Sequence, residues 1–303
     1  MNENEAAAAA LAARFEEHRP RLNAVAYRML GSLGESEDAV QEAWLRLSRS
    51  EAGAVENLGG WLTTVVGRIC LDLLRSRQSR REDSLDISME THVPDPVVSR
   101  VDAVVDPEQE VLIADSVGLA LLVVLETLAP AERLAFVLHD MFAVPFDEIA
   151  PVVERSAAAT RQLASRARRR VRDSAPAPDA DLGRQREVVE AWMAATKAGD
   201  FDALLELLDP DVVLRADTGE LSSGLSKLVR GAATVAGQAA MFGRMAPSSR
   251  LVLVNGAPGL VAAPGGEPFS VASFTVVDGR IVEINIIADP ERLRGLGLAS
   301  FEA

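Results

Sequence analysis

The chain has 303 residues, enough for two or three domains, and 48% of them are hydrophobic, which excludes a largely disordered protein. Acidic residues outnumber basic ones, 45 to 31, so the formal charge of −14 argues against a protein coated in nucleic acid while allowing a local basic surface. No stretch approaches the ~20 apolar residues of a membrane span, and the N-terminus lacks the basic start of a secretory signal. We therefore expect a cytoplasmic protein without membrane contact.

Cysteine and histidine are scarce in this chain. The single cysteine, Cys70, lies in an apolar helical pattern between Ile69 and Leu71, which favours a buried, inert thiol over a nucleophile. With only three histidines, a Cys/His metal site is not expected. We predict neither a metal nor a cofactor.

The first part of the chain, residues 1–82, has the apolar spacing of helices. A helix is predicted over residues 15–30, and Ser36 is a plausible N-cap for the next one, because Glu37 and Asp38 suit its positive end. A loop rich in glycine and asparagine then precedes a helix whose apolar face includes Trp61 and Leu73. These elements predict an all-α domain.

Residues 83–107 are acidic and contain Pro94, Pro96 and Pro107, which indicates an interdomain linker. A second helical domain is predicted over residues 108–174. In it, Pro130 fits the first turn of a helix, and helices over 146–153 and 157–172 are joined by a short turn. The sequence Ser-Ala-Pro-Ala-Pro indicates another linker over residues 175–183.

The last part, residues 184–303, changes character. Helical patterns over 184–198 and 201–208 are followed by strand patterns over 212–214, 251–254, 260–263, 271–277 and 281–287. The dipeptide Asp278-Gly279 predicts a type I′ hairpin between the last two strands. Helices followed by an antiparallel sheet predict an α+β domain.

The helices predicted over 146–153 and 157–172 form a helix-turn-helix candidate for the DNA major groove. From Arg155 to Arg172 there are seven arginines and no acidic residue. Ser156 can cap the second helix, and residues near that cap are placed to read bases, whereas later arginines are placed to bind phosphates. The predicted DNA contacts are Ser156, Thr160, Arg161, Gln162, Ser165, Arg166, Arg168 and Arg169. An isolated basic helix is equally compatible with a solvated surface.

Two further helices carry patterned polar residues. Arg68, Asp72 and Arg75 share one helical face, which could bind a separated DNA strand together with Asn57 and Arg77, or could simply be an ion-paired surface. In the preceding helix, polar side chains lie opposite the apolar residues Val40, Trp44 and Leu47. They are Asp38, Gln41, Glu42 and Arg46, and they fit either an ordinary amphipathic helix or a partner-binding face.

Taken together, these segments resemble a sigma factor of the extracytoplasmic-function type. Residues 38–46 (DAVQEAWLR) resemble sigma region 2.2, residues 60–75 resemble regions 2.3 and 2.4, and residues 128–133, 146–150 and 161–168 resemble region 4. The resemblance implies that Asp38, Gln41, Glu42 and Arg46 bind the β′ clamp helices of core RNA polymerase, with the β flap as a further contact. It also implies that the second and third segments read the −10 and −35 promoter elements.

The remainder resembles the SnoaL-like domain fused to one group of these sigma factors, a cone-shaped α+β fold shared with nuclear transport factor 2. The WLPEP, DGGGR and NPDKL motifs of that group correspond to residues 92–96 (HVPDP), 217–220 (DTGE, with one glycine kept) and 289–293 (DPERL). The resemblance implies regulation in cis, without a separate anti-sigma factor, by a domain that docks on the sigma domains. The residues concerned are Pro94, Asp95, Pro96, Asp217, Asp289, Pro290 and Arg292. A small ligand in the cone is a further candidate.

Two other classes of function compete with this interpretation. A cyclase or isomerase needs a positioned acid or base, and only Arg215, Asp217 and Glu220 are candidates, since no histidine follows His139. A one-component repressor with a ligand domain would explain the helix-turn-helix but not the two helical segments before residue 76. We therefore predict a sigma factor that is not an enzyme.

Overall fold

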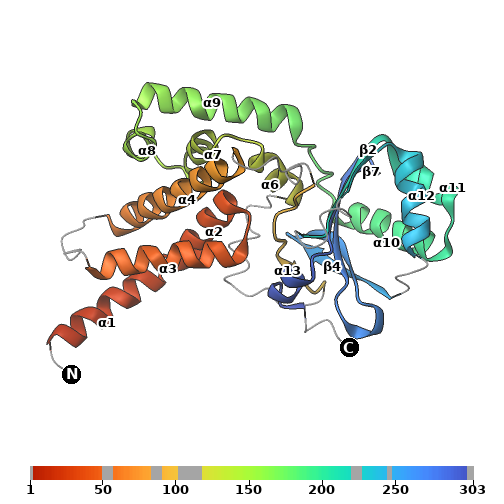
Figure 1. Ribbon diagram of the computed structural model, residues 1–303, viewed down its shortest axis with the longest axis horizontal. Coiled ribbons are helices and arrows are strands. Elements are labelled where there is room, and N and C mark those ends of the chain that lie inside the picture. The colour runs from red at the N-terminus through yellow and green to blue at the C-terminus, as the bar shows by residue number, and fades with distance from the viewer. Residues whose placement is uncertain are drawn as a thin grey trace. The chain divides into compact units, whose positions relative to one another are not determined.

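The computed structural model describes residues 3–49, 57–82, 91–101, 118–219, 227–243 and 248–298. The chain divides into two compact units. The first contains helices from the N-terminal part and the helix-turn-helix, and the second contains residues 91–101 together with the chain from Ala175 onward (Figure 1). The stretch predicted as an interdomain linker therefore belongs in part to the C-terminal unit.

The first unit begins with α1 (Glu3–Glu16), α2 (Arg19–Leu30), α3 (Leu33–Arg49) and α4 (Leu58–Glu82). The prediction of a single helix over residues 15–30 is wrong. Helix α1 ends at Glu16, and α2 begins at Arg19 with Pro20 in its first turn. The predicted N-cap at Ser36 is also wrong. Ser36 lies inside α3, and its hydroxyl donates to the Ser32 carbonyl at 2.5 Å.

The second half of this unit contains α6 (Leu119–Glu126), which is shared between the units, α7 (Pro130–Phe136), the π-helix η3 (Val137–Met141), α8 (Phe146–Val153) and α9 (Ala157–Ser174). Pro130 is in the first turn of α7, as predicted. The Ser156 hydroxyl accepts from the backbone N–H of Ala159 at 3.2 Å, which confirms it as the cap of α9. Glu154 has φ 56°, the left-handed conformation that makes the turn between α8 and α9.

The interior of the first unit combines apolar side chains with the buried arginines Arg28 and Arg133. Cys70 is buried, as predicted, and burial raises the pKa of its thiol to about 12. Arg133 in α7 donates from Nε to the carbonyl of Arg28 in α2 at 3.0 Å, and burial lowers the pKa of Arg133 to about 10. The Arg28 guanidinium lies 5.1 Å from the ring centre of Phe142. These contacts join α2 to α7 and to the turn after η3.

The second unit is α+β, as predicted. Its helices and strands are α10 (Leu182–Ala198), α11 (Phe201–Leu207), β2 (Leu208–Asp217), β3 (Lys227–Arg230), α12 (Ala232–Gly243), β4 (Ser249–Val254), β5 (Ala257–Ala262), the 3₁₀ turn η5 (Pro264–Gly266), β6 (Ser270–Val277), β7 (Arg280–Ile287) and α13 (Pro290–Gly295). The turn between β6 and β7 has φ 52° at Asp278 and φ 77° at Gly279, which confirms the type I′ hairpin.

The sheet has the strand order β1-β4-β5-β6-β7-β2-β3. Its pairs are antiparallel except β2 with β7, so the prediction of a purely antiparallel sheet is wrong and the sheet is mixed. The parallel pair is possible because a long crossover separates these strands in sequence. Strand β1 (Val98–Ser99) comes from the predicted linker and pairs with β4 at one edge.

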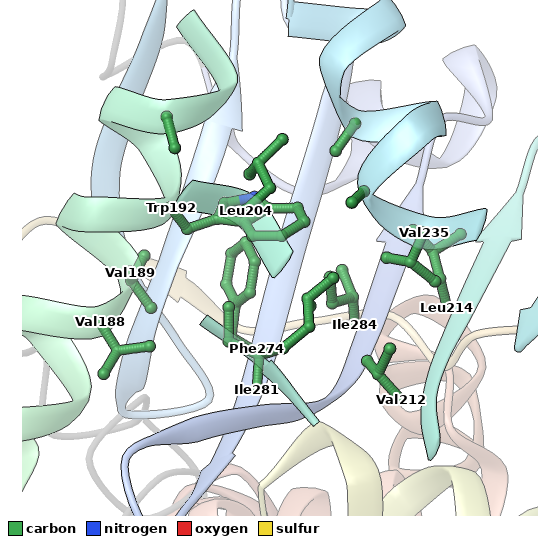
Figure 2. Packing of buried hydrophobic residues seen from close by; sticks show 14 of the residues in the cluster. Val188, Val189, Trp192, Leu204, Val212, Leu214, Val235, Phe274, Ile281 and Ile284 are labelled. Carbon is green, nitrogen blue, oxygen red and sulfur yellow. The ribbon is translucent and has the colours of Figure 1, made fainter. Parts of the chain in front are cut away.

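One face of this sheet packs against α10, α11 and α12 through apolar side chains (Figure 2). Leu214, Phe274 and Ile284 from three strands belong to this core. The rings of Trp192 in α10 and Phe274 meet edge to face, with centroids 6.0 Å apart. Because side chains alternate along a strand, the polar neighbours of these core residues point to the opposite face. Asp217, three residues after Leu214 in β2, points to that opposite face.

Candidate functional site

Helix α9 presents an exposed polar row along the surface of the first unit. Arg161, Ser165 and Arg169 are spaced four residues apart and are exposed, and Gln162 beside them is exposed as well. The opposite face of α9 is buried through Ala164 and Ala167. The helix-turn-helix therefore positions an arginine near the capped end of α9 and another two turns further along, as the sequence predicted for a DNA-reading helix.

Thr160 does not belong to this row, and its predicted role in base reading is wrong. Its side chain is fully buried, and its hydroxyl donates to the Ser156 carbonyl at 3.0 Å. The helical phase explains the error, since Thr160 is four residues before Ala164 and thus shares the face that packs against the unit. Thr160 supports the start of α9 and cannot reach a base.

Several arginines of α9 are bound to carboxylates of the same unit. Arg168 makes two hydrogen bonds to Asp140, at 2.6 and 3.2 Å, and these bonds raise the pKa of Arg168. Arg166 lies 3.2 Å from Glu132, and Arg170 lies 3.8 Å from the same carboxylate. These pairs attach α9 to α7 and η3, so Arg166 and Arg168 have a packing role that the sequence reading missed.

Helix α4 carries the strip predicted to contact the −10 element. Arg68, Asp72 and Arg75 are all exposed, as their shared face required. Arg68 lies 3.9 Å from Glu154 at the end of α8. Asn57 accepts from the N–H of Gly60 at 3.0 Å and so caps α4. The loop before it, residues 51–56, lies outside the described residues.

Arg77 differs from the rest of this strip. Its guanidinium forms an ion pair with Glu35 of α3 and donates to the Leu30 carbonyl at 3.3 Å, and its side chain is only 22% exposed. The predicted DNA contact of Arg77 is therefore not supported. The residue fastens the C-terminal half of α4 to α2 and α3, a contact between segments more than 40 residues apart that helical spacing cannot reveal.

Helix α3 presents the face predicted to bind core polymerase. Asp38, Gln41 and Arg46 are exposed, and Glu42 pairs with Arg46 at 3.0 Å. Leu45 is 38% exposed on the same helix, four residues after Gln41. The sequence prediction missed Leu45. Its position four residues after Gln41 places it on the polar face of the helix and could have revealed it. An exposed leucine among charged groups suits a protein-binding surface.

In the second unit, Arg292 of α13 connects two of the predicted motifs. Its Nε donates to Asp95 at 2.7 Å, its Nη1 donates to Asp217 at 2.8 Å, and its Nη2 donates to the Val93 carbonyl at 2.5 Å. The side chains of Asp95 and Asp217 are only 13% and 8% exposed. We call Arg292 and the groups bound to it, the Asp95 and Asp217 carboxylates and the Val93 carbonyl, the Arg292 clasp.

Asp217 receives additional donors within the Arg292 clasp. His92 Nδ1 lies 3.1 Å from its carboxylate, and the backbone N–H groups of Val93 and Gly219 donate to it at 3.1 and 3.0 Å. Burial alone would raise the pKa of Asp217, but these hydrogen bonds outweigh burial and lower the pKa to about 2. Asp217 is thus a charged anchor, and His92, which replaces the tryptophan of the motif, is a contact that the sequence reading did not foresee.

The third motif completes the clasp from the other side. Asp289 caps α13 by accepting from the N–H of Glu291 at 2.9 Å, and Pro290 occupies the first turn. Gly219 has φ 78°, and a Cβ added there would meet the Asp289 carboxylate at 2.3 Å. The one glycine kept from the DGGGR motif is therefore required by both conformation and space. Glu220 lies outside the described residues.

The segment between these motifs is folded onto the sheet. Pro94 and Pro96 are buried, the N–H of Val97 donates to the Asn255 side chain at 3.0 Å, and the N–H of Asn255 donates back to the Val97 carbonyl at 2.8 Å. Strand β1 follows directly. All of the predicted regulatory residues are thus brought together in one unit, with Asn255 as an additional anchor.

Two of the residues considered for enzyme chemistry, Arg215 and Asp217, form ion pairs with other side chains of the domain. Arg215 donates to Glu283 at 2.7 Å, and Asp217 belongs to the Arg292 clasp. Among the described residues, no group of three or more His, Cys, Asp or Glu side chains could hold a metal ion. Within those same ranges, no helix is long and apolar enough to cross a bilayer.

The fold defines a protein in which a helical unit with a helix-turn-helix is followed by an α+β domain. The chain matches the family descriptions "Sigma-70 region 2" over residues 14–80, "Sigma-70, region 4" over residues 118–171 and "SnoaL-like domain" over residues 189–284. The three matches cover the helices α2–α4, the helix-turn-helix and most of the mixed sheet.

Similar proteins of known family cover almost the whole chain. The ECF RNA polymerase sigma factor SigJ of Mycobacterium tuberculosis is 41% identical over 93% of this chain and 92% of its own, and the probable ECF sigma factor SigI of the same species is 38% identical over 93% and 94%. The crystal structure of SigJ superposes with a TM-score of 0.74 at 37% identity, covering 95% of this chain and 99% of that one. The chain belongs to the extracytoplasmic-function sigma factors, which are transcription initiation factors and not enzymes.

Proposed function

We propose that three surfaces of the first unit divide the work of initiation. The exposed face of α3 binds core RNA polymerase, the strip Arg68, Asp72 and Arg75 on α4 contacts the opened −10 element, and α9 reads the −35 element. The observation that carries this assignment is the row on α9, where Arg161 and Arg169 remain exposed while neighbouring arginines are held by carboxylates. Arg161 lies near the cap, where base contacts are made, and Arg169 lies where phosphates pass.

We further propose that the C-terminal domain regulates this activity in cis through the Arg292 clasp. The segment from Val93 to Ser99 lies in sequence between the two DNA-binding parts, yet it is folded into the C-terminal sheet. Any rearrangement of those parts that pulls on this segment works against the ion pairs of Arg292. The clasp therefore favours one arrangement, and a small ligand in the C-terminal domain would shift the balance only by binding one arrangement better than the other. A separate anti-sigma factor is then unnecessary.

Run-off transcription tests both proposals. Full-length protein is added to core RNA polymerase from a GC-rich bacterium, with genomic fragments that include the protein's own upstream region as templates. Start sites that appear only when this protein is added support its role in initiation. Loss of those start sites in Arg161→Ala supports the assignment of α9, and their loss in Asp38→Ala supports the assignment of α3. Binding of duplex DNA without polymerase, combined with no initiation, would contradict it.

The regulatory proposal is tested with a point variant in the full chain rather than by truncation. Removal of the C-terminal domain would expose Val93, Pro94 and Val97, which are buried against it. Arg292→Ala opens the clasp and leaves the sheet intact, so we expect a change in transcript yield from the same start sites. Equal yields from Arg292→Ala and the unmodified protein would count against regulation through the clasp.

A further inference from the structure

A stacked group of three side chains lies at the entrance to the recognition helix. The rings of His139 and Phe146 are stacked, with centroids 3.7 Å apart and planes inclined by 28°. The guanidinium carbon of Arg161 lies 5.2 Å from the centre of the Phe146 ring. The three residues come from η3, α8 and α9, so the group joins the element before the helix-turn-helix to both of its helices.

The backbone around His139 is unusual in a way that serves this group. Residues Val137–Met141 form a π-helix, a rare form that recurs at functional sites. Ala143, just beyond it, has φ 56°, a backbone conformation that residues other than glycine seldom adopt. The turn is closed by His139 itself, whose Nδ1 donates to the carbonyl of Val144 at 3.0 Å. This bond fixes the imidazole plane under Phe146.

Phe146 lies outside the fully buried interior of the unit. Ile149 and Val153 of α8 and Ala164 and Ala167 of α9 are buried, whereas Phe146 is partly exposed at the first turn of α8. A partly exposed aromatic ring beside an exposed arginine has a different physical use, because the negative face of the ring attracts the guanidinium.

Arg161 differs from its neighbours in what it contacts. In the part of the chain that the structure describes, Arg166 and Arg168 contact carboxylates, and Arg161 contacts the Phe146 ring. A carboxylate would occupy the N–H groups of the guanidinium, whereas an aromatic face leaves them available. A ring-held arginine can therefore still donate two hydrogen bonds to a base edge, most favourably to O6 and N7 of guanine.

We propose that Phe146 is a positioning residue for promoter recognition: supported by His139, it holds the guanidinium of Arg161 in the orientation that reads a base of the −35 element. The proposal rests on the function proposed above for Arg161. An arginine ordered before binding loses less side-chain freedom on the DNA than a mobile one. This smaller entropy loss favours only the base that Arg161 contacts, so Phe146 contributes to specificity without touching DNA.

The test uses the complete protein in holoenzyme with core RNA polymerase, bound to a pool of duplexes in which the hexamer at the −35 position is randomised. The variants are Phe146→Leu, Phe146→Tyr, Arg161→Ala and their combination, and bound sequences are counted. Arg169→Ala serves as the phosphate control. We expect Arg161→Ala to abolish the preference at one base position and Phe146→Leu to weaken that same preference about two- to fivefold, the size of an exposed cation–π contact. Phe146→Tyr, which keeps the ring, should restore it, and Phe146→Leu should add nothing to Arg161→Ala.

Other outcomes overturn the proposal in distinguishable ways. If Phe146→Leu weakens binding to all sequences alike, the residue is merely structural. If Arg161→Ala alters one position and Phe146→Leu alters none, Phe146 does not position the arginine. If Arg161→Ala alters no position, the reading role proposed for Arg161 fails and the positioning role fails with it. Thermal unfolding of each variant shows whether it folds, and Phe146→Met replaces Phe146→Leu if the latter does not.

Discussion

Replacement of Arg292 by alanine should release the segment at residues 93–98 from the C-terminal sheet. Arg292 is bound to Asp95 and Asp217 at 2.6–2.8 Å, and both carboxylates are mostly buried. Removing one partner of a buried ion pair costs about 3–5 kcal/mol, because the remaining charge is left uncompensated. Here Asp217 keeps three other donors, and Arg292 itself is 20% exposed. We therefore expect a cost just below this range, about 2–3 kcal/mol.

Amide hydrogen exchange on the full-length protein measures this release directly. The N–H groups of Val93 and Val97 are bound to Asp217 and Asn255, so they exchange when the segment opens. A loss of 2–3 kcal/mol corresponds to ~30- to 160-fold faster exchange at these amides if local opening limits it. Amides in the centre of β6 should be unaffected.

Two further variants make the experiment specific. Arg294 lies two residues away on the same helix and is exposed, so Arg294→Ala removes an equal charge and should leave the exchange of Val93 and Val97 unchanged. Arg292→Lys keeps the charge but cannot donate from a planar fork to two carboxylates, and we expect an intermediate rate. Unchanged protection in Arg292→Ala would refute the reasoning, because the ion pairs would then contribute nothing to holding the segment.

Three more predictions concern single contacts. Arg169→Ala should weaken holoenzyme binding to all promoters alike and lower the slope of log affinity against log salt by about one, which a salt titration measures. Thr160→Val should leave the −35 sequence preference unchanged in the randomised pool, since Thr160 is buried. His92→Ala should raise the pKa of Asp217 from about 2 toward its ordinary value near 3.8, followed by carboxyl NMR. When folding lowers the pKa of a carboxyl, that carboxyl stabilises the folded state fully at any pH above its unfolded pKa. The stabilisation is lost as the pH falls through the folded pKa, here about 2. Because His92→Ala raises the folded pKa, the Arg292 clasp of this variant should open at a higher pH.

The elements that the sequence predicted correctly are those determined by local chemistry. Helix α8 has the predicted limits, because Pro145 and the left-handed Glu154 bound it, and the hairpin at Asp278-Gly279 follows from the dipeptide alone. The exposed row on α9 followed from helical spacing. Thr160 was misplaced because spacing gives relative angles around a helix but does not state which face the rest of the fold covers.

The pairing of strands that are distant in sequence could not be predicted from local patterns. The parallel pair of β2 with β7 and the addition of β1 to β4 join segments that carry no shared local signal. The acidic, proline-containing stretch around Pro94 has the composition of a linker, and a composition cannot show that its backbone groups are satisfied by a distant sheet. The ion pair of Arg77 with Glu35 is hidden for the same reason, since an arginine on a helix is normally expected to be solvated.

The Arg292 clasp shows where resemblance and physical chemistry each contribute. The motifs placed Asp95, Asp217 and Arg292 in one functional group, although Arg292 and Asp95 are 197 residues apart. The structure shows how they interact: one guanidinium donates hydrogen bonds to two mostly buried carboxylates that would otherwise repel each other. His92 shows what neither source predicts alone, because a departure from the motif that looked like a loss supplies another donor to Asp217. A motif can therefore keep its buried contacts while its residues change, provided that each buried carboxylate retains a donor.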